Sequence, residues 1–215
     1  MTYLQLVNKV LVRLREKTVT SVDANVYSAL IGQFVNDAKQ LVEDAWDWSA
    51  LRTTLTVTTS ADVFNYNLTG SGNRATILDV VNDTTNFFLT YKDAHWFNKI
   101  YLTTDYPVGS PYYYTFNGID DNGDTAVDIY PKPDGVYSLR FNVVLRTPEL
   151  EADTDVVSIP TNPIVHLALA MALREKGETG GQSAAEAYNY GQIALSDAIA
   201  LDAAKHPEET IFSVV

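Results

Sequence analysis

The spacing of hydrophobic residues changes twice along the chain. In residues 1–50 and again in 160–206 they recur every three or four positions, as on one face of an amphipathic helix. In residues 51–159 apolar and polar side chains alternate, as in strands that are buried on one face. Neither helical stretch has enough apolar surface to form a core alone. The pattern predicts an α+β fold, with N- and C-terminal helices in one helical bundle and an inserted antiparallel β-sandwich or barrel.

Two helices are predicted in the N-terminal stretch. The first begins after Thr2, whose hydroxyl can cap it, and runs to about Lys17. The second covers roughly residues 24–46, with Asp23 or Asn25 as its N-cap. At 1.5 Å per residue this second helix is about 35 Å long, which is enough to serve as the spine of the helical part.

Two further helices are predicted in the C-terminal stretch. Asn162 can cap the first of them, Pro163 suits its first helical position, and Gly177 is expected to end it. Ser183 and Glu186 have the spacing of a capping box at the start of the second. Many alanines in this last helix allow neighbouring helices to approach closely. Residues 207–215 follow it as an apolar-tipped C-terminal tail.

The middle of the chain is expected to contain about seven strands. Residues 52–68 resemble a β-hairpin with its turn near residues 60–62, and a short helical segment is expected after Asp93. Trp46 and Trp48 are predicted to fill the junction between the helical and β parts rather than to bind a ligand. The further predicted strands are 76–81, 87–91, 112–116, 125–130 and 136–146.

Composition and charge exclude several classes of function. The 215 residues include no cysteine, so neither disulfides nor thiolate metal sites are available. A formal net charge of −12 argues against a tight grip on nucleic acid, which needs Lys and Arg to neutralise phosphates. Polar residues interrupt the apolar positions near the N-terminus, so no secretion signal or membrane span is predicted and a cytosol-like location is expected.

Catalytic chemistry is not indicated. The three histidines lie apart in the sequence and in no metal-binding spacing. Asp120, Asn122 and Asp124 match the start of a calcium loop, but Thr125 stands where that loop needs Gly and Pro131 where it needs Glu, so a polar turn is predicted instead. No catalytic residue, metal or cofactor is therefore expected, and the protein is predicted not to be an enzyme.

One alternative function comes from the aromatic residues of the β part. Tyr112, Tyr113 and Tyr114 could offer ring faces for stacking on sugars, with Tyr113 pointing opposite to its two neighbours. A β-sandwich carbohydrate-binding module of a phage or bacterial surface protein is therefore the second hypothesis.

Four stretches carry a family resemblance: TYLQLVNKVLVRLRE, VNDAKQLVEDAWDWSALRTTLTVTT, HLALAMALREKGETGG and ALSDAIALDAAKHPEE. In these stretches the chain is similar to the head-to-tail adaptor, or connector, proteins of short-tailed phages, of the tail tubular protein A type. The resemblance implies a structural virion protein at the head-to-tail junction, assembled in the host cytoplasm. It implies a ring of twelve copies that binds the portal protein and the tail nozzle protein. During genome ejection, DNA would pass the acidic channel without specific binding.

The resemblance also assigns surfaces. The tail residues Ile211, Phe212, Val214 and Val215 are expected to order on binding the portal. The second and last helices can pack side by side between subunits, which suggests Tyr27, Phe34, Leu41, Tyr188, Leu195 and Ile199 as subunit-interface residues. The nozzle-facing loops are expected to include Tyr106, Pro107, Asp120 and Asp121.

Overall fold

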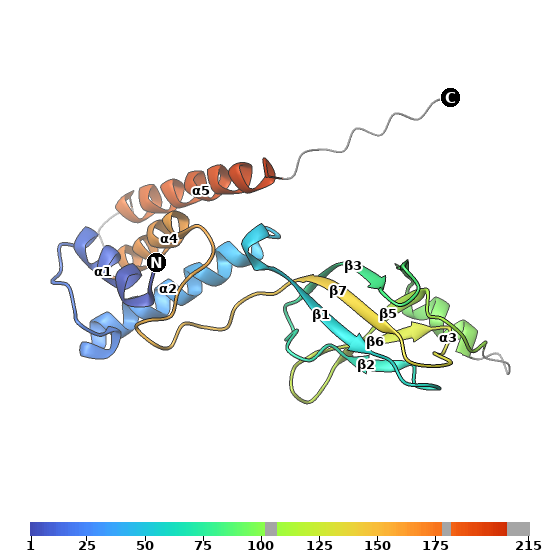
Figure 1. Cartoon of the computed structure of the whole chain (residues 1–215). Helices are drawn as coiled ribbons and strands as arrows, with labels where there is room; N and C mark the ends of the chain where they lie inside the picture. The colour runs from blue at the N-terminus through green and yellow to red at the C-terminus, as the bar shows by residue number, and fades with distance from the viewer. Residues whose placement is uncertain (102–106, 178–181, 206–215) are drawn as a thin grey trace, which may run out of the picture. The chain divides into compact units, whose positions relative to one another are not determined.

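A computed structural model describes residues 1–101, 107–177 and 182–205 of the chain. They divide into two compact units. The helical unit contains Met1–Ala50 together with the residues from Thr147 onward, and the β unit is Leu51–Arg146 (Figure 1). Within the described residues there are five α-helices and seven strands, which confirms the predicted α+β class.

The two N-terminal helices begin where the capping signals place them. α1 (Tyr3–Arg13) starts after Thr2, whose hydroxyl accepts the N–H of Gln5 at 3.3 Å while the Gln5 side chain accepts the N–H of Thr2 at 3.1 Å. This helix is shorter than predicted, since Arg15 already adopts a positive φ of 60°. α2 (Val26–Asp44) is capped by Asn25, one of the two expected caps.

The two C-terminal helices differ from their predicted starts. α4 (Thr161–Glu175) begins two residues before Pro163, which therefore lies in its first turn and not at its first position. It ends before Gly177, whose φ of 65° suits a residue without a side chain. α5 (Gln182–Ala203) is already helical at Ser183, so that residue lies inside the first turn. α4 packs against α1, α2 and α5.

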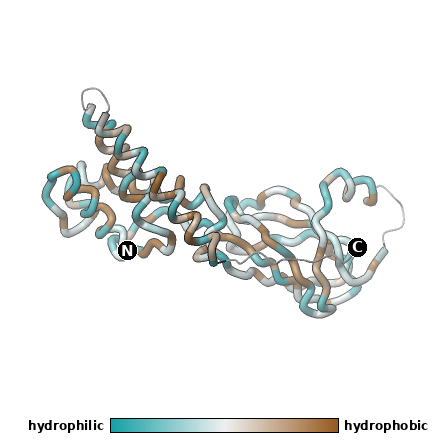
Figure 2. Tube along the Cα trace, turned by 90° about the horizontal axis from the view of Figure 1, so that it is seen from above, coloured by the Kyte–Doolittle hydropathy of each residue, from teal (hydrophilic) through white to brown (hydrophobic). Residues whose placement is uncertain are grey.

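Hydrophobic residues along these helices recur at short intervals between polar ones (Figure 2). Among the described residues, no helix has both the length and the continuous apolar character that a membrane span requires.

The strands of the β unit form one seven-stranded, nearly closed, barrel-like sheet in the order β1-β7-β3-β4-β5-β6-β2. Their core is apolar and includes Val80, Val127, Ile129, Leu139 and Phe141, all fully buried. The strands are β1 (Arg52–Thr58), β2 (Asn65–Asn67), β3 (Thr76–Asn82), β4 (Phe87–Tyr91), β5 (Tyr113–Ile119), β6 (Thr125–Tyr130) and β7 (Ser138–Val144).

Two predictions about this sheet are wrong. β1 and β2 do not form a hairpin, because β1 pairs with β7 and β2 pairs with β6. The sheet is also not wholly antiparallel, since β4 and β5 run parallel. Parallel neighbours need a crossover connection, and α3 (Ala94–Tyr101) lies in that connection, capped by Asp93 as predicted.

The chain that leaves the β unit runs along the helices before α4 begins. Residues 147–159, which the sequence assigned to the β part, are hydrogen bonded within the helical unit. Tyr3 N–H donates to the carbonyl of Asp155 at 2.8 Å, and Val157 N–H donates to the carbonyl of Met1 at 3.0 Å. Residues 147–159 are thus joined to the start of α1 by backbone hydrogen bonds.

Candidate functional site: anchors and exposed surfaces of the helical unit

A buried carboxylate joins the end of α5 to the turn that follows α2. Asp202, only 4% exposed, accepts the Ser49 hydroxyl at 2.5 Å, the Ser49 N–H at 2.9 Å and the Trp46 indole N–H at 3.2 Å. Lys205 donates to the same carboxylate at 2.9 Å. Burial acts to raise the pKa of Asp202, but the hydrogen bonds from Ser49 and Lys205 outweigh it and hold this pKa below its usual range.

A second polar anchor holds the chain returning from the β unit. Lys39 and Glu43 on α2 form a buried ion pair at 3.2 Å. Lys39 also donates to the carbonyls of Thr147 and Pro148, at 3.0 and 2.8 Å, and the Thr147 hydroxyl donates to Glu43 at 2.5 Å. Polar side chains on one face of α2 therefore replace the water that the returning backbone would otherwise bind.

The α4–α5 pair is closely packed along part of its length. A Cβ atom added to Gly191 on α5 would lie 2.9 Å from the Leu167 side chain on α4 and 3.3 Å from its backbone nitrogen. Real Cβ atoms do not approach neighbours that closely, so only glycine fits this crossing.

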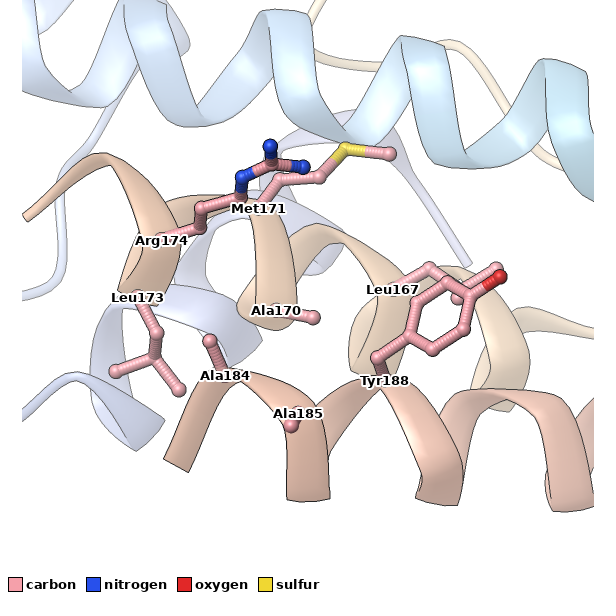
Figure 3. Close-up of a pocket in the computed structure, with 8 residues that line it drawn as sticks. All are labelled: Leu167, Ala170, Met171, Leu173, Arg174, Ala184, Ala185 and Tyr188. Carbon is pink, nitrogen blue, oxygen red and sulfur yellow. The ribbon is translucent and has the colours of Figure 1, made fainter. Parts of the chain in front are cut away.

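Beside this contact the two helices leave a groove of about 440 Å³. Figure 3 shows Leu173 and Ala184 facing each other between the helices, with the ring of Tyr188 beside Leu167. Its lining is apolar apart from the Arg174 guanidinium and the Tyr188 hydroxyl. The groove could accept an apolar side chain from another molecule.

Several large apolar side chains of α5 are exposed. Tyr188, Tyr190, Ile193 and Leu201 are between 51% and 73% exposed. Large exposed apolar side chains grouped on one element mark surfaces that other proteins cover. The helix thus has one buried face toward α4, and its exposed surface carries large apolar side chains among polar ones such as Glu186 and Gln192.

Comparison with known families identifies the family of this chain. Residues 1–208 match the family described as SU10 adaptor protein, so the match includes both compact units. The chain belongs to the SU10 adaptor protein family. A comparison with curated proteins finds no match. Membership supports the resemblance to a phage head-to-tail adaptor, while the tail tubular protein A type within that group stays a prediction.

The predicted subunit-interface residues of this family member lie on two helices that both pack against α4. On α2, Leu41 is 52% exposed, and the Tyr27 ring lies 5.0 Å below the Lys176 ammonium. On α5, Tyr188 lines the groove. Phe34, Leu195 and Ile199 are half-buried. Their contact with another subunit stays a prediction.

The other predicted surface residues are placed only in part. The portal-binding tail residues and Tyr106 lie outside the described residues. Pro107 and Asp121 are exposed. Asp120 stabilises its own turn, because its carboxylate accepts the N–H groups of Asn122 and Asp124 at 2.9 and 2.8 Å. Its contact with a nozzle stays a prediction, and the polar turn predicted for this segment is confirmed.

The aromatic residues of the β unit pack on one another. Tyr114 is buried in the core, whereas Tyr113 points away from it and meets the Trp96 ring edge to face at 4.9 Å. The prediction that Tyr113 also points away from Tyr112 is wrong, because the centres of these two rings lie 4.7 Å apart. The Lys92 ammonium lies 5.0 Å from the centre of the same Tyr113 ring. This packing attaches α3 to the sheet and favours a structural role for these rings over sugar stacking.

Within the described part of the chain, no three His, Asp or Glu side chains are arranged to hold a metal ion. The anchors around Asp202 and Lys39 were not expected from the sequence. A signal for Asp202 was present, since it lies four residues after Ala198 and eleven after Gly191, on the face of α5 that is otherwise small and apolar.

Proposed function

We propose that the protein is the subunit of a phage head-to-tail adaptor that forms a ring, joins the portal to the tail nozzle and lets DNA pass through its channel. The observation that carries the proposal is the family match, which includes both compact units. The exposed apolar side chains of α5 and the groove beside it support it, because they would be covered in a ring of copies.

The finer assignments are part of the same proposal. The ring has twelve copies, the four helices of the helical unit act as one bundle, and the apolar tail of residues 207–215 binds the portal. Loops of the β unit face the nozzle. The role is structural, with no catalytic step, at the head-to-tail junction of a virion assembled in the host cytoplasm. The net charge of −12 per copy supports a channel to which DNA does not adhere.

The proposal is tested by mixing the purified full-length protein with the purified portal protein of the same phage and imaging the mixture by negative-stain electron microscopy. The expected result is a ring stacked on the portal. A protein that stays monomeric and unattached beside intact portals would contradict the proposal. Glycan-array binding by that monomer would support the carbohydrate-binding alternative instead.

A further inference from the structure

Both flanks of α5 border a recess toward α4, and the two flanks differ in charge. On one flank lies the groove, formed by Leu167, Ala170, Leu173, Arg174, Ala185 and Tyr188. On the other flank lies a row of exposed side chains, Tyr190, Ile193, Asp197 and Leu201, which we call the stripe. At 3.6 residues per turn, these two sets fall on opposite sides of the buried positions Ala187, Gly191 and Ala198.

The two surfaces carry opposite charges and both are largely apolar. The groove is apolar with an exposed arginine at its rim, and the stripe is apolar with an exposed aspartate among its members. Ile193 and Leu201 are 58% and 73% exposed, so they are available to enter a recess on another molecule. Arg174 and Asp197 have opposite charges, and such pairs at the rim of an interface fix its register more than they add to its affinity.

We propose that the stripe of one copy packs into the groove of a second copy, with Asp197 of the first beside Arg174 of the second. Because groove and stripe lie on opposite flanks of one helix, the contact is heterologous and each copy keeps one free groove and one free stripe. The inference rests on the proposed ring and names the surfaces that join its members.

Charge reversal tests the pairing. In the Arg174→Asp variant, the aspartate at position 174 in the groove of one copy would face Asp197 in the stripe of the next. In the Asp197→Arg variant, two arginines would face each other at the same contact. Each variant alone should assemble on the portal about tenfold or more weaker than wild type, measured by sedimentation of full-length protein with portal rings. A mixture of the two variants should recover wild-type assembly, because every groove then finds a stripe of opposite charge.

Other outcomes overturn the pairing. If stripes met stripes across a two-fold axis, Arg174→Asp alone would assemble normally. If both variants assembled like wild type, neither residue would lie at the interface. A mixture no better than its components would also contradict the pairing.

Cysteine crosslinking supplies a second readout that does not depend on charge. The wild-type chain has no cysteine, so each introduced thiol is unique. Leu173→Cys in one copy and Ile193→Cys in another should form a disulfide on the assembled ring, whereas Ile193→Cys copies alone should not. Thr54→Cys, on an exposed position of β1, is the control. Rings without this crosslink would overturn the inference and leave the proposed function standing. Wild-type protein that forms no ring on the portal would instead overturn the proposed function.

Discussion

Asp202 shows how one side chain can secure the end of a helix. Its carboxylate oxygens accept hydrogen bonds from a hydroxyl, a backbone N–H, an indole N–H and an ammonium group, all within 3.2 Å. Hydrogen bonds to a charged acceptor are the stronger ones, and removing the acceptor leaves buried donors without partners. The residue therefore contributes to stability although it lies among small apolar neighbours.

Asp202→Asn should lower the free energy of unfolding of the helical unit by about 1–3 kcal/mol, because the amide keeps one acceptor oxygen and loses the charge. Urea denaturation followed by tryptophan fluorescence measures this, since Trp46 and Trp48 lie in the same unit. Asp197→Asn, at an exposed position of the same helix, is the matched control and should change stability little. Equal effects of the two substitutions would contradict the anchor.

The stability that Asp202 contributes should depend on acid pH. Its pKa is lowered on folding from the ordinary value of 3.8, so the unfolded chain takes up a proton first as the pH falls. The contribution is fully present above about pH 5 and is lost as the pH falls through the folded pKa. The difference in unfolding free energy between wild type and Asp202→Asn should therefore be smaller at pH 3 than at pH 6. A difference that is the same at both pH values would contradict this assignment.

The buried pair of Lys39 and Glu43 makes a different prediction. Lys39→Met should destabilise the helical unit by about 3–5 kcal/mol, because the buried Glu43 carboxylate loses the ammonium group that lies beside it. Changing both residues to Met should be less damaging than this single change. Chemical denaturation of the two variants checks the order. The exposed pair of Lys176 and Glu16 is the control, for which Lys176→Met should change stability by less than about 1 kcal/mol.

At the scale of elements, the local pattern of apolar and polar residues predicts where some strands begin and end, but it does not predict which strands pair. β4 and β6 begin and end where the alternation of side chains begins and ends. Which strands lie beside them in the sheet depends on contacts between residues far apart in the chain. The alternation of side chains along one strand contains no information about those contacts. β1 therefore resembled half of a hairpin although it pairs with β7, and the start of α4 was misplaced because Pro163 suits several first-turn positions.

The close approach of α4 and α5 gives an element-scale prediction. Gly191→Val should destabilise the helical unit by about 1–3 kcal/mol, since the added side chain would overlap the Leu167 side chain and lie against its backbone nitrogen. Gln192→Val, at the next and exposed position of α5, is the matched control. Thermal unfolding followed by circular dichroism measures both. Adding Leu167→Ala to Gly191→Val should recover part of the loss, and no recovery would contradict the assigned overlap.

At the scale of the whole molecule, the sequence is enough to indicate the family, whereas the surfaces of α5 can be identified only from the structure. The resemblance came from the helical ends, which are distinctive in sequence, whereas the groove and stripe of α5 depend on which helix lies beside it. The sequence predicts Tyr188 as an interface residue, and Tyr188 lines the groove, but its neighbours from α4 depend on how the helices pack.

Deletion of residues 207–215 should abolish attachment to the portal while the described fold stays intact. The expected cause is the loss of four apolar side chains, Ile211, Phe212, Val214 and Val215, from a segment too small to fold alone. Co-sedimentation with portal rings measures attachment, and circular dichroism with thermal unfolding checks that the rest of the protein is unchanged. Attachment equal to that of wild type would contradict the assignment of the tail.

The β unit is inserted between residues 50 and 147, and the chain is fixed within the helical unit just outside both ends of the insertion. Ser49 is held by Asp202, and Thr147 is held by Lys39 and Glu43. A pulling force on the inserted unit would therefore act on two polar contacts, that of Ser49 with Asp202 on α5 and that of Thr147 with Lys39 and Glu43 on α2. Each of these two contacts can be weakened by a single substitution that leaves the other intact.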